Sequence, residues 1–395
     1  MPARIRNEFR PTHSLTRRDF LRSAAATAAL VAAAPATFAQ SAPTIPGKER
    51  LIVNSYRFLD LEMPLEELHS WVTPVELFFV RNHVAEPFAV NMDEWTLSIV
   101  GEVERPLKLT MSDLAKLQHA NVVNTLECAG NGRSFYEPHV PGIQWRRGAV
   151  GTARFTGPRL RDVLMRAGLK PTARHVAFRG LEEPPSAVPQ FIRSVPIEKA
   201  LDPHTLVALQ MNGATLGKHH GFPARVLVPG WVGAASVKWL REISVLDHEF
   251  VGNYMKPGYR IPAHPVSPGD EVRPEDTVSL TALNVKSVIA HPAEGATVRG
   301  QVRIDGAAWA GENEIVKVEL STDGGQNWQP AQLGSEQAKF AWRLWSLPWR
   351  PQRAGEALLM ARATDSAGRV QPEAPPWNPA GYLWNGWDKV KVNVG

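Results

Sequence analysis

The residue best suited to chemistry is Cys128, the only cysteine in the 395-residue chain. It lies in the segment 124–133, where an apolar run ending near Leu126 is followed by Ala-Gly-Asn-Gly. The apolar run predicts the end of a buried strand, and the residues after it predict a tight turn, because Gly and Asn tolerate a positive φ. A thiol at such a tip, with Arg133 nearby, is expected to have a low pKa and to be able to ligate a metal. A small buried hydrophobe would also explain a lone cysteine, and the segment alone leaves both interpretations open.

Polar residues that follow two other apolar segments can bind an anion or a cofactor. Residues 81–83 (Arg-Asn-His) close the apolar segment 76–80, although an ordinary polar turn would explain them equally well. Residues 217–225 include two adjacent histidines, but these lack the spacing of zinc ligands and one cysteine cannot complete such a site. We therefore expect a histidine there to bind an anion or a cofactor. The small residues from Gly233 onward let the backbone approach a ligand closely, and Lys238 can contact a phosphate.

Arginines are dense after the cysteine segment, and their planar guanidinium groups match oxyanions. They stand at Arg133, Arg146, Arg147, Arg154, Arg159 and Arg161. Arg159 and Arg161 are assigned to the solvated face of a helix over 159–167, which Gly168 should end. Arg133 and Arg154 are better candidates for a site because they flank the cysteine loop and a predicted turn region at 151–157.

The elements that must position these residues are mostly short strands and turns. The 33 prolines, 30 glycines and 13 tryptophans are typical of a strand-rich and loop-rich fold. Strands are predicted at 76–80, 96–100, 175–180 and 226–228, short helices at 65–68 and 114–117, and a hairpin turn at Asn212-Gly213. A capping-box pattern at Thr110–Asp113 should begin the second helix.

The first 39 residues are predicted to be an export signal. Residues 16–22 (Thr-Arg-Arg-Asp-Phe-Leu-Arg) resemble the twin-arginine motif, and the apolar stretch 24–34 is too short to anchor a protein in a membrane. Small residues at 37–39 supply a cleavage site. The expected destination is the bacterial periplasm, an oxidising compartment, and the twin-arginine route exports folded proteins that often already carry a cofactor. In that compartment Cys128 must be buried, paired with another chain or ligated.

The predicted signal also explains the basic charge of the chain. Of the 44 basic and 39 acidic residues, residues 1–39 contain six arginines and two acids. The rest of the chain is therefore almost neutral overall, and we expect no nucleic-acid binding.

The chain after the signal is long enough for two domains. The segment 263–277, rich in proline, glycine and charge, is predicted to link a first domain at 40–262 to a second at 278–395. The second domain shows alternating short strands at 298–304, 316–320, 358–364 and 390–394, with a turn at 323–325. These predict a β-sandwich of about seven strands whose role is structural or in subunit contact.

Together these segments resemble the sulfite oxidase family of molybdenum enzymes over nearly all of the chain after the signal. The matching segments are 79–83, 126–131, 148–164, 220–225, 228–230 and 236–239, followed by 308–309, 321–325 and 385–387. The resemblance implies an α+β molybdopterin-binding domain followed by an immunoglobulin-like β-sandwich dimerisation domain, and therefore a homodimer.

The same resemblance implies a role for individual residues. Cys128 would give its thiolate to molybdenum, and a soft thiolate suits a metal that already has dithiolene sulfur ligands. The molybdopterin and its phosphate would be held by Phe79, Val80, Arg81, Asn82, His83, Glu182, His220, Arg225, Ser236, Val237 and Lys238. Arg81, Arg133 and Trp145 would line an anion pocket beside the metal.

The implied reaction is oxygen-atom transfer that oxidises sulfite, a small oxyanion, to sulfate. The sequence has no Cys-x-x-Cys-His haem motif, so electrons would leave to an external acceptor such as a periplasmic cytochrome c. No membrane anchor is expected after cleavage of the signal. An alternative is a sulfane dehydrogenase subunit of a thiosulfate-oxidising complex, or another oxo-transfer enzyme. A non-enzymatic periplasmic binding protein is disfavoured by the cysteine together with the full set of cofactor segments.

Three positions depart from the pattern of the family. Gly306-Ala307 stands where a pocket tyrosine is expected, Pro379–Gly381 lacks an arginine, and Pro141 replaces a lysine. We therefore expect the anion pocket, and with it the substrate, to differ more from the family's sulfite oxidases than the metal centre does.

Overall fold

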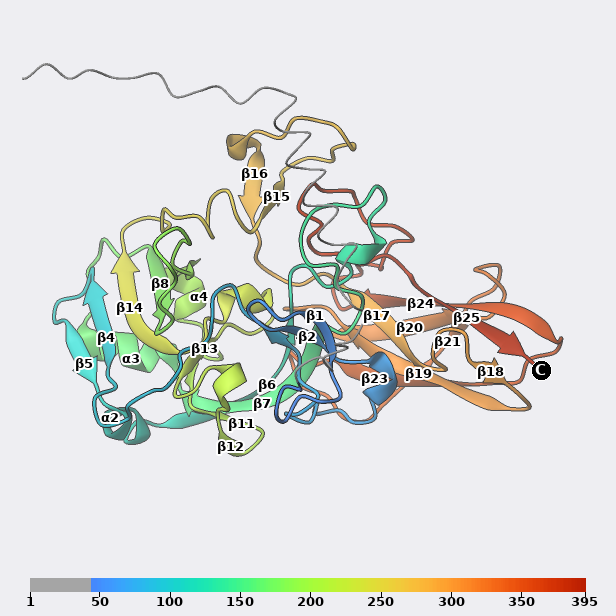
Figure 1. The fold of residues 1–395 in the computed structure, drawn as a ribbon, viewed down its shortest axis with the longest axis horizontal. Helices are drawn as coiled ribbons and strands as arrows, with labels where there is room; N and C mark the ends of the chain where they lie inside the picture. The colour runs from blue at the N-terminus through green and yellow to red at the C-terminus, as the bar shows by residue number, and fades with distance from the viewer. Residues whose placement is uncertain (1–43) are drawn as a thin grey trace, which may run out of the picture. The chain divides into compact units, whose positions relative to one another are not determined.

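The computed structural model describes residues 44–395, so the predicted export signal lies outside the described residues. Gly47–Gly395 forms one compact unit (Figure 1). Strands and loops dominate it, as the composition predicts. Its helices are short: α2 (Met111–Ala115), α3 (Leu160–Ala167) and α4 (Ile197–Ala200), with the 3-10 turns η1 (Leu65–Glu67), η2 (Arg133–Phe135), η3 (Lys218–His220), η4 (Gly233–Ala235) and η5 (Pro274–Asp276). None of the helices within 44–395 has the length and apolar character needed to cross a membrane.

Several sheets build the first part of this unit. One joins β1 (Ile52–Ser55), β2 (Asp60–Glu62) and β3 (Val80–Arg81); a second runs β12 (Ala214–Thr215), β11 (Gln210–Met211), β7 (Val150–Pro158) and β6 (His119–Glu127). A third runs β5 (Leu107–Leu109), β4 (Leu97–Gly101), β14 (Leu240–Leu246), β8 (His175–Gly180) and β9 (Ile192–Pro196), and β10 (Leu206–Ala208) pairs with β13 (Arg225–Leu227). The β4–β14 pair is parallel and the other pairs are antiparallel. This mixture confirms the predicted α+β class.

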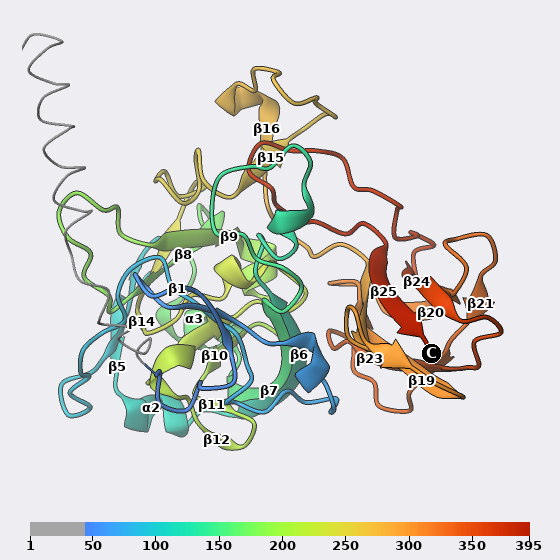
Figure 2. The ribbon, with the colours of Figure 1, turned by 45° about the vertical axis from the view of Figure 1, so that its right-hand side comes forward.

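The strands β6 and β7 carry the cysteine segment (Figure 2). They pair along nine residues, and the burial of β6 increases toward its end at Glu127. The backbone N–H of Cys128 donates to Ala149 O at 2.9 Å, which continues the ladder by one step. Cys128 therefore lies at the tip of a buried strand, as predicted. The predicted turn at 151–157 is wrong because this segment is the interior of β7.

The glycines that prompted the wrong turn prediction have another role. A Cβ atom on Gly157 would lie 2.1 Å from Val207 O, and one on Gly151 would lie 2.8 Å from the ring of Phe78. These glycines let other segments pack directly against the backbone of β7. Glycine in a strand and glycine in a turn look alike in the sequence.

Most local predictions are confirmed, and two further strand predictions are wrong in part. The predicted strand 298–304 is interrupted at 299–301, between the strands Thr297–Val298 and Val302–Trp309. The capping box of Thr110 and Asp113 begins α2, Gly168 ends α3 with φ of +73°, and Asn212-Gly213 forms the turn between β11 and β12. The segment 76–79 is a turn, and only Val80–Arg81 forms the strand β3. Its apolar residues Leu77 and Phe78 are both buried, which a turn within the core achieves as well as a strand does.

The second part of the unit is a sandwich of two sheets. One sheet runs β17 (Lys286–His291), β19 (Val302–Trp309), β23 (Arg343–Trp349) and β22 (Gln332–Leu333); the other runs β18 (Thr297–Val298), β25 (Asp388–Val394), β24 (Gly355–Asp365), β20 (Ile315–Ser321) and β21 (Gln329–Pro330). Alternate residues such as Val318 and Leu320 of β20 share a buried core with Ile304 and Trp345 of the facing sheet. The predicted sandwich is confirmed. The hairpin of β15 (Arg260–Pro262) and β16 (Thr277–Ser279) brackets the predicted linker.

The sandwich contacts the strand that leads to the cysteine. Thr125 of β6 donates its N–H to Phe340 O at 2.8 Å, and Trp342 donates its N–H to Thr125 Oγ1 at 2.8 Å. Nearby, Trp71 and Trp342 each donate an indole N–H to the other's backbone carbonyl, at 2.9 and 2.8 Å. Because Trp342 is fully buried, these bonds form in the interior of the unit rather than at its surface.

Candidate active site

Two adjoining cavities share four lining residues, Arg81, His83, Cys128 and Tyr259. The first cavity also contains most of the residues predicted to hold a cofactor: Phe79, Asn82, Glu182, His220, Arg225, Ser236, Val237 and Lys238. The second contains Arg133 and Trp145 together with Asn253, Tyr254, Gly258 and Tyr382. Of the residues that the resemblance assigns to the cofactor or the anion pocket, only Val80 lines neither cavity, because its side chain is buried in the interior beside β2.

Cys128 is held by a tight backbone turn. Its carbonyl accepts the N–H of Asn131 at 2.9 Å, and the turn ends at Gly132 with φ of +93°. A Cβ atom on Gly130 would lie 2.8 Å from the Arg133 guanidinium. Glycines are thus required both for the backbone conformation and for the approach of Arg133, which confirms the predicted turn.

The predicted low pKa of the thiol is wrong for the protein without a ligand. Burial raises the pKa of Cys128, and the positive charges of Arg81 and Arg133 offset only part of that effect. The sequence indicates a nearby arginine but does not show that the thiol is 8% exposed. Coordination to a metal cation would supply the charge that releases the proton.

Of the six arginines between 133 and 161, only Arg133 lines either cavity. Arg133 is 7% exposed and donates from Nε to Ala380 O at 3.1 Å and from Nη1 to Ile143 O at 3.0 Å. Both acceptors are neutral carbonyls, and within 44–395 Arg133 forms no ion pair, so its charge remains available to an anion. Arg154, the other candidate, is exposed on β7 and lines neither cavity.

The first cavity is lined by a group of buried cations. Burial, followed by the neighbouring charge of Arg225, lowers the pKa of Lys238 to about 7. Burial lowers the pKa of Arg225 to about 10, and burial with nearby cations places the pKa of His220 well below its usual range. Burial and mutual repulsion disfavour the charged forms of these three side chains. A bound dianion would stabilise those charged forms.

Three segments of the first cavity are locked together by Arg225. This residue begins β13 and donates from Nη1 to His220 O at 3.1 Å and from Nη2 to Ser236 O at 2.9 Å. Ser236 Oγ in turn accepts the N–H of Val228 at 3.0 Å. Gly221, with φ of +105°, lets the chain turn between the histidine and the strand. Hydrogen bonds within the protein therefore fix the positions of His220, Arg225 and Ser236.

An aromatic wall on the shared side of the cavities was not predicted. His83 stacks on Phe191 with centroids 4.2 Å apart, and its Nε2 lies 2.5 Å from Tyr259 Oη. Tyr254 and Tyr382 line the second cavity beside Tyr259. The segment 253–259 precedes the proline-rich stretch and has no strand or helix pattern, so the sequence offered only the tyrosines themselves as a signal.

The expectation that the anion pocket lacks a tyrosine is therefore wrong. Ala307 lies in β19, is fully buried and lines neither cavity. Pro141 is exposed and also lines neither. The third departure does lie at the site, since Ala380 O is the acceptor for Arg133. Position along the chain was a poor guide to position in space here.

Lys48 is a second residue that the sequence did not single out. Its Nζ donates to Phe78 O at 2.9 Å and to Val75 O, and lies 2.9 Å from His220 Nε2. When Lys48 is protonated, its ammonium group only donates, so Nε2 accepts and the proton of a neutral His220 lies on Nδ1. A protonated Lys48 thus sets the tautomer that His220 presents.

Several buried polar atoms of the first cavity have no partner among residues 44–395. They are Asn82 Nδ2, Glu182 Oε2 and Arg225 Nε. Buried polar atoms are normally hydrogen-bonded, so such a set on one cavity wall fits a polar ligand. Burial also raises the pKa of Glu182 to about 7, which suits a carboxyl group that exchanges hydrogen bonds with a heterocycle. Within 44–395 no cluster of three or more His, Cys, Asp or Glu residues is arranged as a metal site.

Two family models match the chain. Residues 83–254 match the oxidoreductase molybdopterin binding domain, and residues 277–395 match the Mo-co oxidoreductase dimerisation domain. Among curated proteins, mitochondrial sulfite oxidase of Rattus norvegicus is 39% identical, covering 87% of this chain and 66% of that protein. Sulfite oxidase of Gallus gallus is 38% identical (89% and 79%), and that of Arabidopsis thaliana is 33% identical (91% and 98%). The chain thus spans just under two thirds of the length of the mammalian relatives.

A solved structure has a similar fold. The sulfane dehydrogenase SoxCD from Paracoccus pantotrophus superposes with a TM-score of 0.73 and 27% sequence identity. The match covers 90% of this chain and 87% of that one, so it includes both the first part of the unit and the sandwich.

Proposed function

The chain belongs to the sulfite oxidase family of molybdopterin oxidoreductases, and from that premise we propose that it oxidises sulfite to sulfate by oxygen-atom transfer. The observation that carries the proposal is the position of Cys128 at the junction of two cavities. One cavity has the cations and unpartnered polar atoms that a pterin phosphate needs. The other presents the charge of Arg133 toward the same thiol.

The residues of the first cavity fit molybdopterin. Lys238, Arg225 and His220 would bind the phosphate, while Asn82 and Glu182 would bind polar atoms of the pterin. Cys128 would be the protein's one ligand to the metal, the remaining ligands coming from the cofactor. When bound, the molybdenum centre supplies the oxygen atom and accepts two electrons.

The protein's own contribution is to bind and orient the oxyanion. Arg81 is paired with Asp60, with Nη1 and Oδ1 3.1 Å apart, so part of its charge is already compensated. Arg133 accordingly supplies most of the attraction for the dianion. Trp145 is fully buried, and its ring closes one wall of the second cavity against water.

We also propose an assembly and a location. The twin-arginine pattern at 16–22 supports export to the periplasm, and the dimerisation-domain match at 277–395 supports a homodimer. Electrons would pass to a separate acceptor such as a periplasmic cytochrome c. Fractionation of cells that express the full chain tests the location, and light scattering tests the mass. A cytoplasmic enzyme that keeps residues 1–39 would contradict the export proposal.

Oxidation of a sulfane sulfur is the alternative substrate chemistry. It is supported by the similarity to the sulfane dehydrogenase SoxCD along nearly the whole chain. Sulfite-dependent reduction of ferricyanide or cytochrome c separates the two. Activity on a protein-bound sulfane, with none on sulfite, would favour the alternative.

Substitution of the cysteine tests the metal site. Protein from a host that makes the cofactor should contain close to one molybdenum per chain, and a trace amount only would contradict both enzyme proposals. We expect Cys128→Ser to keep the wild-type circular dichroism spectrum and to lose turnover. Ala129→Ser, a neighbouring buried position, is the control for local disturbance. Substantial turnover by Cys128→Ser would show that the thiolate is not the ligand.

A further inference from the structure

A buried ion pair joins the sandwich to the residue next to the cysteine. Lys286, the first residue of β17, places Nζ 2.8 Å from Glu127 Oε1, and both side chains are less than 10% exposed. Trp309, the last residue of β19, donates its indole N–H to Glu127 Oε2 at 2.8 Å. Both carboxylate oxygens of Glu127 are thus bound by residues of the sandwich.

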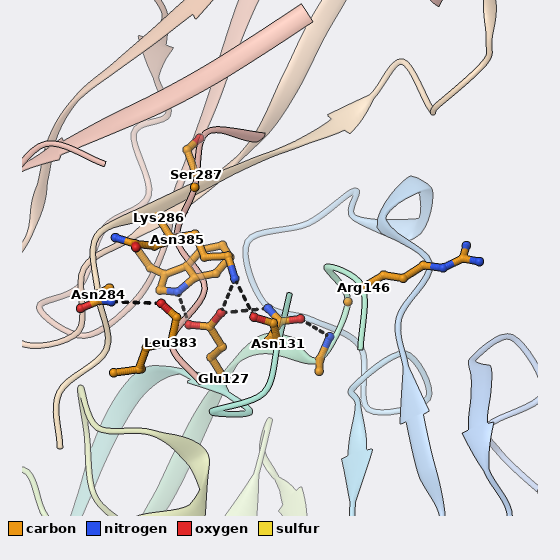
Figure 3. Close-up of polar contacts among 12 residues, drawn as sticks. Glu127, Asn131, Arg146, Asn284, Lys286, Ser287, Leu383 and Asn385 are labelled. Atoms are coloured by element: carbon orange, nitrogen blue, oxygen red, sulfur yellow. Dashed lines mark hydrogen bonds and ion pairs between the residues drawn. The ribbon is translucent and has the colours of Figure 1, made fainter. Parts of the chain in front are cut away.

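The same group of residues also holds the cysteine turn. Asn131 Nδ2 donates to Glu127 Oε1 at 2.9 Å, and Lys286 Nζ donates to Asn131 O at 3.2 Å (Figure 3). Asn131 Oδ1 accepts the N–H of Ala149 at 3.1 Å, immediately before the strand that pairs with β6. The two ends of the turn, at 127 and 131, are therefore fixed by one lysine.

The direction of the side chains makes this arrangement specific. Successive side chains of a strand point to opposite faces, and the hydrogen bond of Cys128 to Ala149 continues the ladder of β6 beyond Glu127. Glu127 therefore points to the sandwich while Cys128 points to the cavities. A rotation of the backbone that moves one of these side chains must move the other.

A second contact, made by a carboxylate that is 47% exposed, lies next to the loop at 233–238. Glu312 of the sandwich accepts from Lys199 Nζ at 2.6 Å and from the indole of Trp231 at 3.2 Å. The backbone just before this loop is also tied to the segment that leads into the sandwich, since the N–H of Val232 donates to Thr281 O at 3.0 Å. A Cβ atom on Gly233 would lie 3.0 Å from Glu127 O, so the two loops also touch each other.

We propose that the sandwich is part of the cofactor site: Lys286 and Trp309 are positioning residues that set the orientation of Cys128 through Glu127. Packing alone cannot replace Lys286, because its removal leaves the uncompensated charge of Glu127 in the interior. The proposal rests on the proposed role of Cys128 as a metal ligand.

The test uses the full chain produced without cofactor, in which iodoacetamide alkylates Cys128, the only cysteine, and does so faster when the turn opens. Trp309→Phe should raise the alkylation rate about tenfold, since it removes a hydrogen bond to a charged group and the rate follows local opening. Lys286→Met should raise it further. In the loaded enzyme, both variants should retain less molybdenum after gel filtration.

Trp71→Phe is the matched control. It also removes one indole N–H bond across the same contact between the two parts of the unit, but the acceptor is Trp342 O, which is not bonded to Glu127 or Asn131 at the ends of the cysteine turn. We expect its alkylation rate to equal that of the wild type. An equal rise in Trp71→Phe, or no rise in Trp309→Phe, would overturn the proposal.

A double variant guards against simple misfolding of Lys286→Met. Glu127→Gln combined with Lys286→Met removes both charges, keeps the shape of the side chain at 127 and keeps an acceptor for Trp309. Its alkylation rate should fall back toward that of the wild type, and a rate as high as that of Lys286→Met would contradict a role of the ion pair. If the wild-type protein binds no molybdenum, the proposed function fails while the alkylation series still reports on the contact.

Discussion

Arg133 is the residue whose substitution should affect substrate binding most directly. It is buried, its hydrogen-bond acceptors are neutral carbonyls, and its charge faces the second cavity. We predict that Arg133→Gln raises KM for sulfite by roughly 10- to 100-fold, the value of one charge-assisted hydrogen bond. Steady-state kinetics at matched molybdenum content measures this. Arg154→Gln, on the exposed face of β7, is the control, and an unchanged KM in Arg133→Gln would contradict the assignment.

Lys48 makes the stability of the protein depend on pH. Burial lowers its pKa from 10.5 to about 7, so above that pH the folded state holds it neutral while the unfolded state remains protonated. The unfolded state then binds more protons, and the free energy of unfolding rises with pH between about 7 and 10. Lys238, lowered to about 7 by burial, acts in the same range.

Removal of Lys48 should therefore reduce this slope. Each such group contributes up to about 1.4 kcal/mol per pH unit, and we predict that Lys48→Met lowers the rise in unfolding free energy between pH 7.5 and 9. Urea unfolding of the cofactor-free protein at both pH values measures it. Lys116→Met, whose side chain is 72% exposed, should keep the wild-type slope. A slope in Lys48→Met equal to that of the wild type would mean that Lys48 is not buried as a neutral amine.

For single residues, the sequence predicted which side chains line the cavities better than it predicted their burial and their partners. Cys128 and the cavity residues from Phe79 to Lys238 carry local patterns, namely a strand tip, a glycine turn and adjacent histidines. Lys48 and Tyr259 carry no such pattern, because their neighbours come from remote segments of the chain. The pKa of Cys128 was mispredicted for the same reason, since burial is a property of the whole fold.

Among the elements, the junction of β2 and β7 depends on one glycine. A Cβ atom on Gly148 would lie 1.8 Å from Met63 O, and Gly148 N donates to Glu62 Oε2 at 3.2 Å. We predict that Gly148→Ala lowers the free energy of unfolding by about 2 kcal/mol or more, because backbone must move to make room. Denaturant unfolding measures it. Gly217→Ala, which has open space and an ordinary φ of −73°, should be nearly neutral. Equal stability of Gly148→Ala and the wild type would refute the close contact.

Elements whose sequence signal lies entirely in neighbouring residues were predicted correctly. Elements that depend on partners from other parts of the chain were not. The capping box of Thr110 and the turn at Asn212-Gly213 depend on neighbouring residues only. The apolar run 76–80 has the composition of a strand, but only its last residue, Val80, pairs with β2, together with the following Arg81. β7 was taken for a turn because its glycines serve packing against Phe78 and Val207.

In the whole molecule, the contacts between the two parts should outlast a break in the chain. The segment 267–271 is exposed throughout, contains a turn in which the N–H of Asp270 donates to Ser267 O at 3.1 Å, and lies between the paired strands β15 and β16. We predict that a protease site placed there can be cut completely while both fragments elute together at the native position. Buried bonds such as Lys286 to Glu127 and Trp342 to Thr125 cross the break. Separation of the fragments without denaturant would contradict this.

The sequence predicted the two parts of the molecule but not the contacts between them. Period-2 alternation correctly indicated the sandwich, and family resemblance indicated its usual role in subunit contact. The ion pair of Glu127 with Lys286 joins residues 159 positions apart, and neither has neighbours that point to the other. A separate structural domain was the natural expectation from the sequence, and participation in the site became visible only in the folded chain.

The late position of these residues in the chain has a consequence for synthesis. The ribosome makes Cys128 and the cation-lined cavity long before Lys286, Trp309 and Tyr382, and Leu383, whose N–H binds Ala129 O at 2.8 Å, comes close to the C-terminus. A nascent or truncated polypeptide would therefore present the thiol on a turn that is not yet fixed. We therefore expect stable capture of the cofactor only after translation has passed Leu383.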